Sequence, residues 1–429
     1  MSRAVAFEVL RQVSSEGGYA NLALKKRLRQ ANLSARDAAL VTELVSGTCR
    51  LLGTYDQIIS RAAGRSLKSL QPAVLDLLRM GAHQLLSMRT PAHAAVGATV
   101  ELARKRIGNR VTGLVNAILR KVASRDLDQW CDLLAEGKQG VEAAAIRGHH
   151  PVWVAEALAE VLPEGELAAA LAANNVSPAP TLVVRPGLCE VEELGSPTRF
   201  SPFGARSTAV PSDIAAVREG RAGVQDEGSQ LVALALARAD APSGPWLDMC
   251  AGPGGKSALL AGLARRAGER LIASELQEHR AHLVAQALAC YGHSDVIVAD
   301  GRTPPWRPAS FARVLADVPC TGLGALRRRP EARWRRQPDD LASLVSVQRQ
   351  LLRTAIAAAV PGGVVAYVTC SPLRAETRAV VESCLADVEV LNAPALLPEV
   401  PDCAVGNYVQ LWPHRHETDA MFLALLRRR

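Results

Sequence analysis

Residues 248–257 read DMCAGPGGKS, and this stretch decides the fold. The apolar residues before it indicate a buried strand, followed by a glycine-rich turn and the start of a helix. Glycines let a ligand approach the backbone closely, and the first turn of a helix offers unpaired N–H groups. A phosphate loop would need glycine where this chain has Cys250, and the dinucleotide pattern GxGxxG fits loosely. An ordinary tight turn is the alternative.

The alternation of strand and helix continues towards the C-terminus. We expect strands at 246–249, 271–275, 295–299, 314–318 and 363–369, and helices at 256–266, after 275 through 289, at 341–360 and at 376–386. Residues 408–412 and 420–427 are expected to form a closing hairpin. This order predicts an α/β fold with a doubly wound, Rossmann-like parallel sheet, in which ligands bind at the carboxyl ends of the strands.

Acidic residues stand at the ends of four expected strands: Asp248, Glu275, Asp300 and Asp317. Glu275 follows the glycine-rich turn by about twenty residues, which is where a carboxylate holds a ribose in such folds. Each acid alone could be a turn or helix-capping residue. Their joint placement at one sheet edge favours a site for a nucleoside-containing cofactor.

Besides Cys250 in the glycine-rich turn, two of the nine cysteines follow strand ends. Cys320 lies in DVPCTG (317–322) and Cys370 in YVTCSP (367–372). The number is odd and none forms a CxxC pair, which argues against a zinc cage or a disulfide framework and favours a reducing cytoplasm. We interpret six others as packing residues: Cys49, Cys131, Cys189, Cys290, Cys384 and Cys403. Cys320 and Cys370 instead suggest thiolate chemistry.

A nucleoside cofactor, two thiols and an aspartate suit methylation of cytosine at C5. That carbon is a poor nucleophile until a thiolate adds to C6, and an acid near N3 stabilises the charge that develops there. C5 then takes the methyl group of S-adenosylmethionine. The base must be unpaired or flipped out of a helix. Spacing leaves open which cysteine attacks.

The first third of the chain is helical in pattern and basic. Residues 1–150 carry 22 Lys and Arg against 12 Asp and Glu, a net charge of +10, while the remainder carries −2. Two clusters of cations could contact RNA phosphates, although a solvated surface is the alternative for each. One cluster lies at 104–121 and includes Arg104, Lys105, Arg106 and Arg120; the other lies at 326–336 and includes Arg327, Arg328 and Arg329.

Three segments follow from these patterns. We expect an all-helical domain at 1–140, a small α/β lobe at 150–240 and the catalytic domain at 241–429. The N-terminus carries charges inside an amphipathic helix, so we exclude a signal peptide. The longest uncharged run, from Thr354, contains Pro361-Gly362-Gly363, which argues against a membrane span. We expect no bound metal, no membrane partner and a monomer.

Three ordered motifs resemble the RNA cytosine-5 methyltransferases. They are Asp248–Lys256, Asp317–Pro330 and Thr369–Ser371, with Gln225–Gln230 similar to the lead-in of that family. Residues 1–140 resemble a NusB-like domain, with VNAILR at 115–120 as the recognisable stretch. The pairing resembles the small-subunit (16S) ribosomal RNA methyltransferase B type, RsmB. That resemblance implies small-subunit ribosomal RNA as the substrate.

The resemblance also implies roles for individual residues. It makes Cys370 the nucleophile, assigns Cys320 to release of the methylated base and places Asp317 against the cytosine and close to the cofactor. It assigns the ribose to Glu275 and the adenine to Asp300. It places S-adenosylmethionine on the backbone of Cys250, Ala251, Gly252, Pro253, Gly254, Gly255 and Lys256.

This chain departs from the family pattern at three places. Thr321 stands where serine is commoner, Gly252 where alanine is common, and TDAMF at 418–422 replaces a DGFF-like stretch. None of these changes removes an expected catalytic group. Two alternatives stay open: the same chemistry on transfer RNA or another ribosomal site, and a non-catalytic RNA-binding assembly factor.

Overall fold

The computed structural model describes residues 1–292 and 295–429. They form two compact units, the first made of residues 1–176 with 326–336 and the second of 177–325 with 337–429. Helices α10 (Val152–Ala159) and α11 (Leu167–Ala173) belong to the first unit. The small lobe therefore begins after residue 176 and not at 150 as expected, because 152–173 form helices that pack with the preceding helices.

The first unit is entirely helical, and its amphipathic helices enclose one core. Val5, Val9 and Val13 lie on one face of the first helix and are all buried, as their spacing predicts. Pro72 occupies the first turn of the fifth helix. The helices before α10 are α1 (Ser2–Glu16), α2 (Ala20–Ala31), α3 (Ala35–Arg50), α4 (Leu52–Ala63), α5 (Pro72–Leu86), α6 (Ala92–Arg106), α7 (Thr112–Val122), α8 (Leu127–Leu134) and α9 (Gly140–Arg147).

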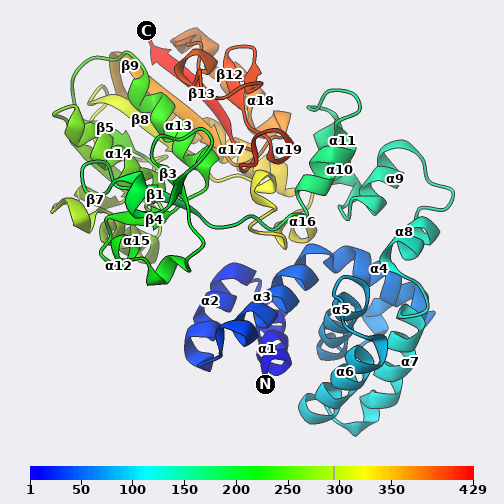
Figure 1. The fold of residues 1–429 in the computed structure, drawn as a ribbon. Coiled ribbons are helices and arrows are strands. Elements are labelled where there is room, and N and C mark those ends of the chain that lie inside the picture. The colour runs from blue at the N-terminus through cyan, green and yellow to red at the C-terminus, as the bar shows by residue number, and fades with distance from the viewer. Residues whose placement is uncertain (293–294) are drawn as a thin grey trace. The chain divides into compact units, whose positions relative to one another are not determined.

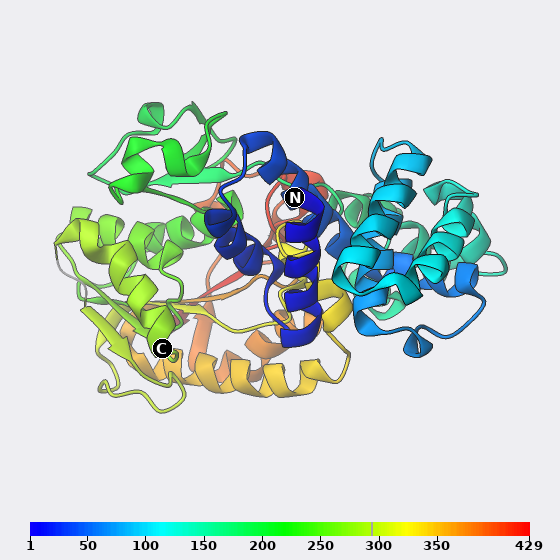
Figure 2. The same cartoon turned by 90° about the horizontal axis from the view of Figure 1, so that it is seen from below.

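An eleven-residue segment from the middle of the sequence completes this unit. Residues 326–336 contain the short helix α16 (Ala332–Arg335) and pack with α1 and α3, far from them in sequence. The yellow segment lies beside the blue N-terminal helices in Figures 1 and 2. The helical unit is thus not made from a continuous stretch of chain.

The second unit begins with a small antiparallel sheet of order β2-β3-β1-β4. Its strands are β1 (Thr181–Val184), β2 (Ser196–Pro197), β3 (Gly204–Arg206) and β4 (Ala222–Val224), with the short helix α12 (Ala215–Arg218) beside them. Buried Leu182, Val184 and Ala205 form its core. This is the small α/β lobe.

The large sheet has the order β11-β12-β13-β9-β8-β5-β6-β7, and β10 also pairs with β13. Strands β5 to β9 are parallel, and the strands of the C-terminal region run antiparallel to their neighbours. The strands are β5 (Trp246–Asp248), β6 (Leu271–Glu275), β7 (Asp295–Val298), β8 (Phe311–Asp317), β9 (Ala359–Thr369), β10 (Val388–Val390), β11 (Ala404–Val405), β12 (Tyr408–Gln410) and β13 (Phe422–Arg428). The predicted parallel sheet and closing hairpin are confirmed.

Helices cover both faces of this sheet. Along β9, Val364, Ala366 and Val368 face a core shared with α13 (Glu227–Arg238) and α14 (Gly255–Arg266), because side chains alternate along a strand. The intervening Val365 and Tyr367 face α17 (Asp340–Ala358) and α18 (Arg378–Val381). Helix α15 (Glu278–Leu288) packs against β6 and α14. Figure 2 shows the long α17 along the lower side of this unit.

The chain order of the parallel strands reverses between β5 and β8. Strands β6 and β7 extend the sheet on one side of β5, and β8 and β9 extend it on the other. Ligands of doubly wound folds bind at such a switch point, outside the carboxyl ends of the strands. Asp248 ends β5, Glu275 ends β6 and Asp317 ends β8, so this edge gathers the predicted residues.

The predicted helix at 376–386 is confirmed only in part, because the chain is helical there but does not form one continuous α-helix. The chain forms a 3-10 turn at Arg374–Glu376, the four-residue α18 and a second 3-10 segment at Glu382–Asp387. Thr377 has φ −117° and ψ −104°, and Cys384 is also non-helical. The buried Tyr367 hydroxyl donates to the Glu376 carbonyl at 2.7 Å. That carbonyl therefore accepts a side-chain hydrogen bond in the core where a continuous helix would use it for a backbone hydrogen bond.

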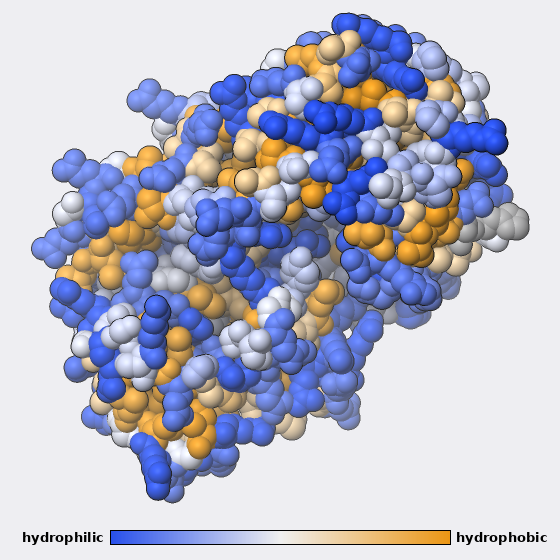
Figure 3. All heavy atoms as spheres, turned by 180° about the vertical axis from the view of Figure 1, so that it is seen from behind, coloured by the Kyte–Doolittle hydropathy of each residue, from blue (hydrophilic) through white to orange (hydrophobic). Residues whose placement is uncertain are grey.

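Charged and polar side chains cover most of the face drawn in Figure 3, with apolar residues scattered among them. Within the described ranges, no helix is both long and apolar enough to cross a bilayer.

Candidate active site

The glycine-rich turn is tightly folded against the neighbouring strand and helix. Ala251 donates its N–H to the Ser274 carbonyl at 2.9 Å, and the Gly254 N–H donates to the Ala251 carbonyl at 2.7 Å. Gly254 has φ +100°, and a Cβ there would come within 2.7 Å of the Ala287 side chain. Glycine is therefore required at 254 on both counts. The turn leads directly into α14, whose first N–H groups face the sheet edge.

Glu275 closes the site on the side of β6. Its carboxylate accepts the Gly252 N–H at 2.9 Å and the Gln277 N–H at 3.0 Å, and only 4% of the residue is exposed. A Cβ at Gly252 would lie 2.2 Å from a Glu275 oxygen, so glycine rather than alanine suits this arrangement. Arg280 binds the Gly252 carbonyl at 2.6 Å and lies 3.5 Å from Glu275. A buried carboxylate beside a glycine turn fits the hydroxyls of a ribose.

Asp248 and Asp300, two more of the four acids at strand ends, differ sharply in environment. Asp248 is buried and accepts the Ser257 hydroxyl at 2.7 Å, and burial raises its pKa to about 7. One Asp248 oxygen lacks a hydrogen-bond partner, so it can accept a donor from a ligand. Asp300 lies two residues past β7 and is held by the Arg302 guanidinium at 2.6 and 3.0 Å. It stays partly exposed at the same sheet edge.

Lys256 and Asp317 form an ion pair across the switch point. The Lys256 Nζ lies 2.8 Å from Asp317 Oδ2, and the Lys256 and Asp317 side chains are 14% and 25% exposed. Burial alone would lower the pKa of Lys256, but the Asp317 carboxylate outweighs it and the pKa is raised. The charge of Cys370 acts on Lys256 in the same direction. Lys256 is therefore stabilised as an ammonium by its ion pair with Asp317.

The two predicted cysteines meet. Cys320 Sγ and Cys370 Sγ lie 3.4 Å apart, and both residues are partly exposed. The hydrogen bond to Cys370, together with burial, raises the pKa of Cys320 well above its ordinary value. Either sulfur can be the donor of the hydrogen bond between them.

Gly324 joins the two cysteine-bearing loops. Its N–H donates to the Cys370 carbonyl at 2.8 Å, and its own carbonyl accepts the Ala420 N–H at 2.9 Å. A Cβ at this position would lie 2.1 Å from the Ala420 carbonyl oxygen. Gly324 thus allows the backbone of its loop to pass close to the backbone at Cys370 and Ala420.

A buried polar cluster behind Cys320 was not predicted. Glu376 accepts hydrogen bonds from Thr321 and Gln348, and Gln348 also donates to the Pro319 carbonyl. The sequence signal was an acid six residues after Cys370, to which no role was assigned. For Gln348 the only sequence signal is that a polar residue stands on the buried face of α17.

The basic residues of α6 and α7 are partly engaged by acids. Glu101, one turn earlier in α6, pairs with both Arg104 and Lys105, and Glu8 pairs with Arg106 at 2.8 Å. Arg120 is exposed on α7. The sequence interpretation treated these residues as one acid-free cluster, but helix periodicity places Glu101 three and four residues before the first two. Their contact with RNA stays a prediction.

Much of the arginine-rich segment points into the helical unit. Arg333 is fully buried and donates to the His149 carbonyl (3.1 Å), the Asn174 carbonyl (3.0 Å) and Asn175 Oδ1 (2.6 Å). Burial, then the Arg50 charge, lowers its pKa to about 9. The Trp334 indole donates to the Arg50 carbonyl at 3.0 Å.

The neighbouring arginines divide between interior and surface. Arg335 donates to the carbonyls of Val13 at 3.1 Å and Gly17 at 2.7 Å. Arg329 lies over the Tyr19 ring, 5.3 Å from its centroid, Arg327 donates to the Val176 carbonyl at 3.4 Å and Arg328 is exposed. The expectation that the whole run faces phosphates is therefore wrong for Arg333 and Arg335, which bind backbone carbonyls.

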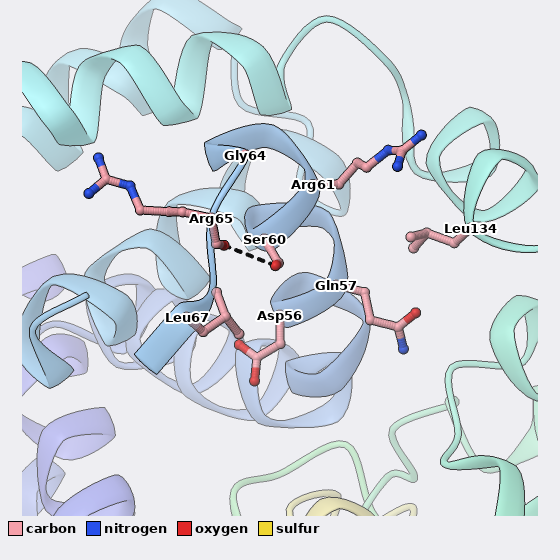
Figure 4. A pocket seen from close by; sticks show the side chains of 8 residues that line it. All are labelled: Asp56, Gln57, Ser60, Arg61, Gly64, Arg65, Leu67 and Leu134. Carbon is pink, nitrogen blue, oxygen red and sulfur yellow. Dashed lines mark hydrogen bonds between the residues drawn. The ribbon is translucent and has the colours of Figure 1, made fainter. Parts of the chain in front are cut away.

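An open hollow of about 800 Å³ lies between α4 and α8 in the helical unit. Figure 4 shows that the Arg61 and Arg65 side chains extend in different directions from it. Asp56 is held by Arg79 at 2.7 Å through both carboxylate oxygens. The lining groups do not converge on one point, so we assign no ligand to the hollow. Among the described residues, no group of three His, Cys, Asp or Glu side chains is arranged to hold a metal ion.

Two family models match the chain. Residues 233–427 match the 16S rRNA methyltransferase RsmB/F family, and residues 1–124 match the NusB family. The putative methyltransferase Rv1407 of Mycobacterium tuberculosis is 49% identical, with 100% of this chain and 96% of the relative covered. The ribosomal RNA small subunit methyltransferase B of Vibrio cholerae is 33% identical, with 99% and 96% covered.

Solved structures show the same fold. The crystal structure of PH0851 superposes with a TM-score of 0.82 at 21% identity, covering 100% of this chain and 99% of that one. A methyltransferase homolog from Pyrococcus horikoshii has a TM-score of 0.53 at 21% identity, covering 67% and 98%. With motifs, fold and full-length relatives in agreement, the chain belongs to the RsmB/F family of S-adenosylmethionine-dependent ribosomal RNA methyltransferases, with a NusB-family region at its N-terminus.

Proposed function

We propose that this protein methylates C5 of a cytosine in small-subunit (16S) ribosomal RNA through a covalent adduct between Cys370 and C6 of the base. The observation that carries the proposal is the pair of thiols 3.4 Å apart at the switch point. A methyltransferase acting on a nucleophilic nitrogen or oxygen needs no thiol. Two thiols beside an ion pair suit a carbon that must first be activated by covalent addition.

Cys370 is the better nucleophile of the pair. The raised pKa of Cys320 favours its thiol form, and a negative charge on Cys370 and the Lys256 ammonium attract each other. When the thiolate adds to C6, negative charge spreads over the ring towards N3. The Lys256–Asp317 pair holds a proton and a positive charge close to Cys370, where they can neutralise that charge.

The chain's own residues fit the cofactor that the family requires. The turn at 250–256 and the start of α14 offer backbone N–H groups, Glu275 offers a ribose acceptor, and a buried Asp248 oxygen is free to accept a donor. Bound S-adenosylmethionine supplies an electrophilic methyl group. The role of the glycine turn is to bring that group to the same edge as the two thiols.

Release needs a base for the C5 proton. Cys320 lies beside Cys370 and can take that proton as a thiolate once its own proton has left. The C5–H electron pair then restores the C5=C6 double bond, and the C6–S bond breaks with its pair returning to Cys370. Support for a ribosomal substrate comes from the relative named ribosomal RNA small subunit methyltransferase B and from the basic helical unit.

The deciding experiment is transfer of labelled methyl groups from S-adenosylmethionine to unmethylated, protein-free small-subunit ribosomal RNA, followed by bisulfite mapping. We expect a single 5-methylcytosine, and no incorporation by Cys370→Ala. Methylation confined to transfer RNA, or to another base or atom, would contradict the proposal. Bound cofactor with no transfer to any RNA would favour a non-catalytic assembly factor.

A further inference from the structure

The loop that carries Cys320 is held from behind by a buried polar cluster. Glu376 accepts the Thr321 N–H at 2.8 Å and the Thr321 hydroxyl at 2.5 Å. Gln348 of α17 donates to Glu376 at 3.0 Å and to the Pro319 carbonyl at 2.9 Å. Both neighbours of Cys320 in the sequence are therefore fixed by the same two side chains.

This cluster is sealed from solvent. Glu376 and Gln348 are 0% exposed and Thr321 is 1% exposed. The Glu376 carboxylate accepts from a backbone N–H, a hydroxyl and an amide, and no ion pair of Glu376 occurs within the described ranges. A buried carboxylate without a cation costs several kcal/mol of desolvation, which hydrogen bonds offset only when their geometry is well fixed. A hydrophobic side chain would stabilise the core at lower cost, so its presence points to a role in the site.

The cluster also reaches the second thiol. The Thr321 hydroxyl lies 3.2 Å from the hydroxyl of Ser371, the residue after Cys370. The Tyr367 hydroxyl fixes the Glu376 backbone through its carbonyl at 2.7 Å. One carboxylate thus ties together the two loops whose sulfur atoms lie 3.4 Å apart.

We propose that Glu376, with Gln348 and Thr321, is a positioning group that holds Cys320 beside Cys370 for the release step. This inference rests on the proposed function. During release Cys370 is bonded to C6 and Cys320 must reach the proton on the adjacent carbon C5. A shift of the 319–321 loop by about 1 Å is enough to slow such a transfer by one to two orders of magnitude. Addition of Cys370 to C6 requires no proton transfer from C5 to Cys320.

Electrostatics act in the same direction. The hydrogen bond to Cys370, burial and the nearby Glu376 carboxylate all raise the pKa of Cys320. A raised pKa favours the thiol form of Cys320 while Cys370 forms the adduct.

The test compares substitutions that differ in one group. Gln348→Leu removes both of its hydrogen bonds, and Gln350→Leu is the matched control, because Gln350 lies two residues later on the exposed side of α17. Glu376→Gln replaces the acceptor, with exposed Glu382→Gln as control. Thr321→Val removes the hydroxyl, and Thr321→Ser restores it. Each variant is mixed with ribosomal RNA and S-adenosylmethionine, and the covalent adduct is measured on denaturing gels.

We expect Gln348→Leu, Glu376→Gln and Thr321→Val to lower kcat about tenfold and to accumulate protein–RNA adduct, with cofactor affinity within about twofold of the parent. Thr321→Ser should accumulate less adduct than Thr321→Val. A purely structural role would lower the folded fraction and reduce adduct and turnover together. Folded variants that turn over slowly without accumulating adduct would overturn the inference.

Cys320→Ala separates this inference from the proposed function. If Cys320→Ala accumulates adduct and the three cluster variants do not, the positioning role is wrong and the release mechanism stands. If Cys320→Ala and parent enzyme form no adduct at all under conditions of methyl transfer, the covalent mechanism itself fails. Should Glu376→Gln not fold, the comparison of Thr321→Val with the parent enzyme decides, because valine carries a methyl group in place of the threonine hydroxyl, and Thr321→Ser shows whether the hydroxyl alone restores release.

Discussion

Two adjoining stretches of the chain place their polar side chains in opposite environments, one at the edge of the sheet and the other in the interior of the helical unit. Residues 317–325 place Asp317 and Cys320 at the open edge of the sheet, where they meet Lys256 and Cys370. Residues 326–336 follow directly, yet their Arg333 and Arg335 turn into the helical unit and bind carbonyl groups. The motif Asp317–Pro330 covers the first stretch and the start of the second, and the sequence suggested substrate contacts for both stretches.

The difference lies in the partners. The residues of the first stretch are fixed by strand ends, and the meeting of parallel strand ends follows from the order of strands. The arginines of the second stretch are fixed by backbone carbonyls of residues more than 150 positions away, such as Val13 and Asn174. Every residue has a carbonyl, so these partners leave no mark in the sequence. Position at a sheet edge therefore predicted which residues lie together better than charge predicted which residues face solvent.

The largest expected effect tests the first stretch. Cys370→Ala should abolish methyl transfer and adduct formation, because no thiolate remains to add to C6. Cys290→Ala is a suitable control, since Cys290 is also partly exposed but lies in the turn after α15. Incorporation of labelled methyl groups is the measurement. Residual transfer by Cys370→Ala comparable to the control would reassign the nucleophile.

The ion pair at the same edge comes next. Lys256→Met removes the ammonium 2.8 Å from Asp317, and we expect kcat to fall about a hundredfold, as when a preorganised group near developing charge is lost. Lys138→Met, which removes an exposed partner of Glu142, serves as control. Single-turnover rates measure the effect. An unchanged rate with normal cofactor affinity would limit Lys256 to a structural role.

The pH dependence of stability tests how Arg333 of the second stretch packs against His149 and His150. Burial, then the Arg333 charge, lowers the pKa of His149 to about 4, and burial lowers that of His150 well below its ordinary value. The unfolded state binds these protons near pH 6.5 and the folded state does not. Stability of the helical unit is therefore complete above pH 6.5 and decreases as pH falls towards 4, by about 3 kcal/mol for His149.

Urea unfolding between pH 7 and 4 measures this dependence. His149→Gln should flatten the pH profile, while His93→Gln, on the exposed side of α6, should leave it unchanged. Asp248 acts in the opposite sense in the other unit, because its raised pKa of about 7 makes its contribution decrease as pH rises. An identical pH profile for His149→Gln and the parent would rule out His149 as the source.

A direct substitution in the segment has a smaller effect. Arg333→Met leaves three buried oxygens without donors but also removes a buried charge, and we expect a net loss of about 2 kcal/mol. Exposed Arg328→Met should change stability by less than about 0.5 kcal/mol. Denaturant midpoints give both values. If Arg328→Met were the more damaging of the two, the inward assignment of Arg333 would be wrong.

The sequence predicted the parts of the fold that depend on the local pattern of apolar residues and turns. The strands that end at Asp248, Glu275 and Asp317 were expected because apolar runs and turns alternate with helices. The sequence predicted one continuous helix at 376–386. The observed interruption depends on hydrogen bonds of Glu376 with Thr321 and Gln348, which are distant in sequence. The role of Gln348 was invisible for the same reason: its partners are close in space and distant in sequence.

The smallest effects concern the cations left for RNA. Arg120 is exposed on α7, whereas Arg104 and Lys105 share Glu101. Arg120→Ala should weaken RNA binding about twofold and reduce its salt dependence, since each phosphate contact releases counterions. Arg104→Ala should do less, because Glu101 already offsets its charge at a surface where such pairs contribute little stability. Glu101→Ala sharpens the comparison: freeing both cations should tighten RNA binding. Salt titrations of RNA affinity measure all three, and equal losses for Arg104→Ala and Arg120→Ala would show that pairing with Glu101 does not remove a cation from the RNA surface.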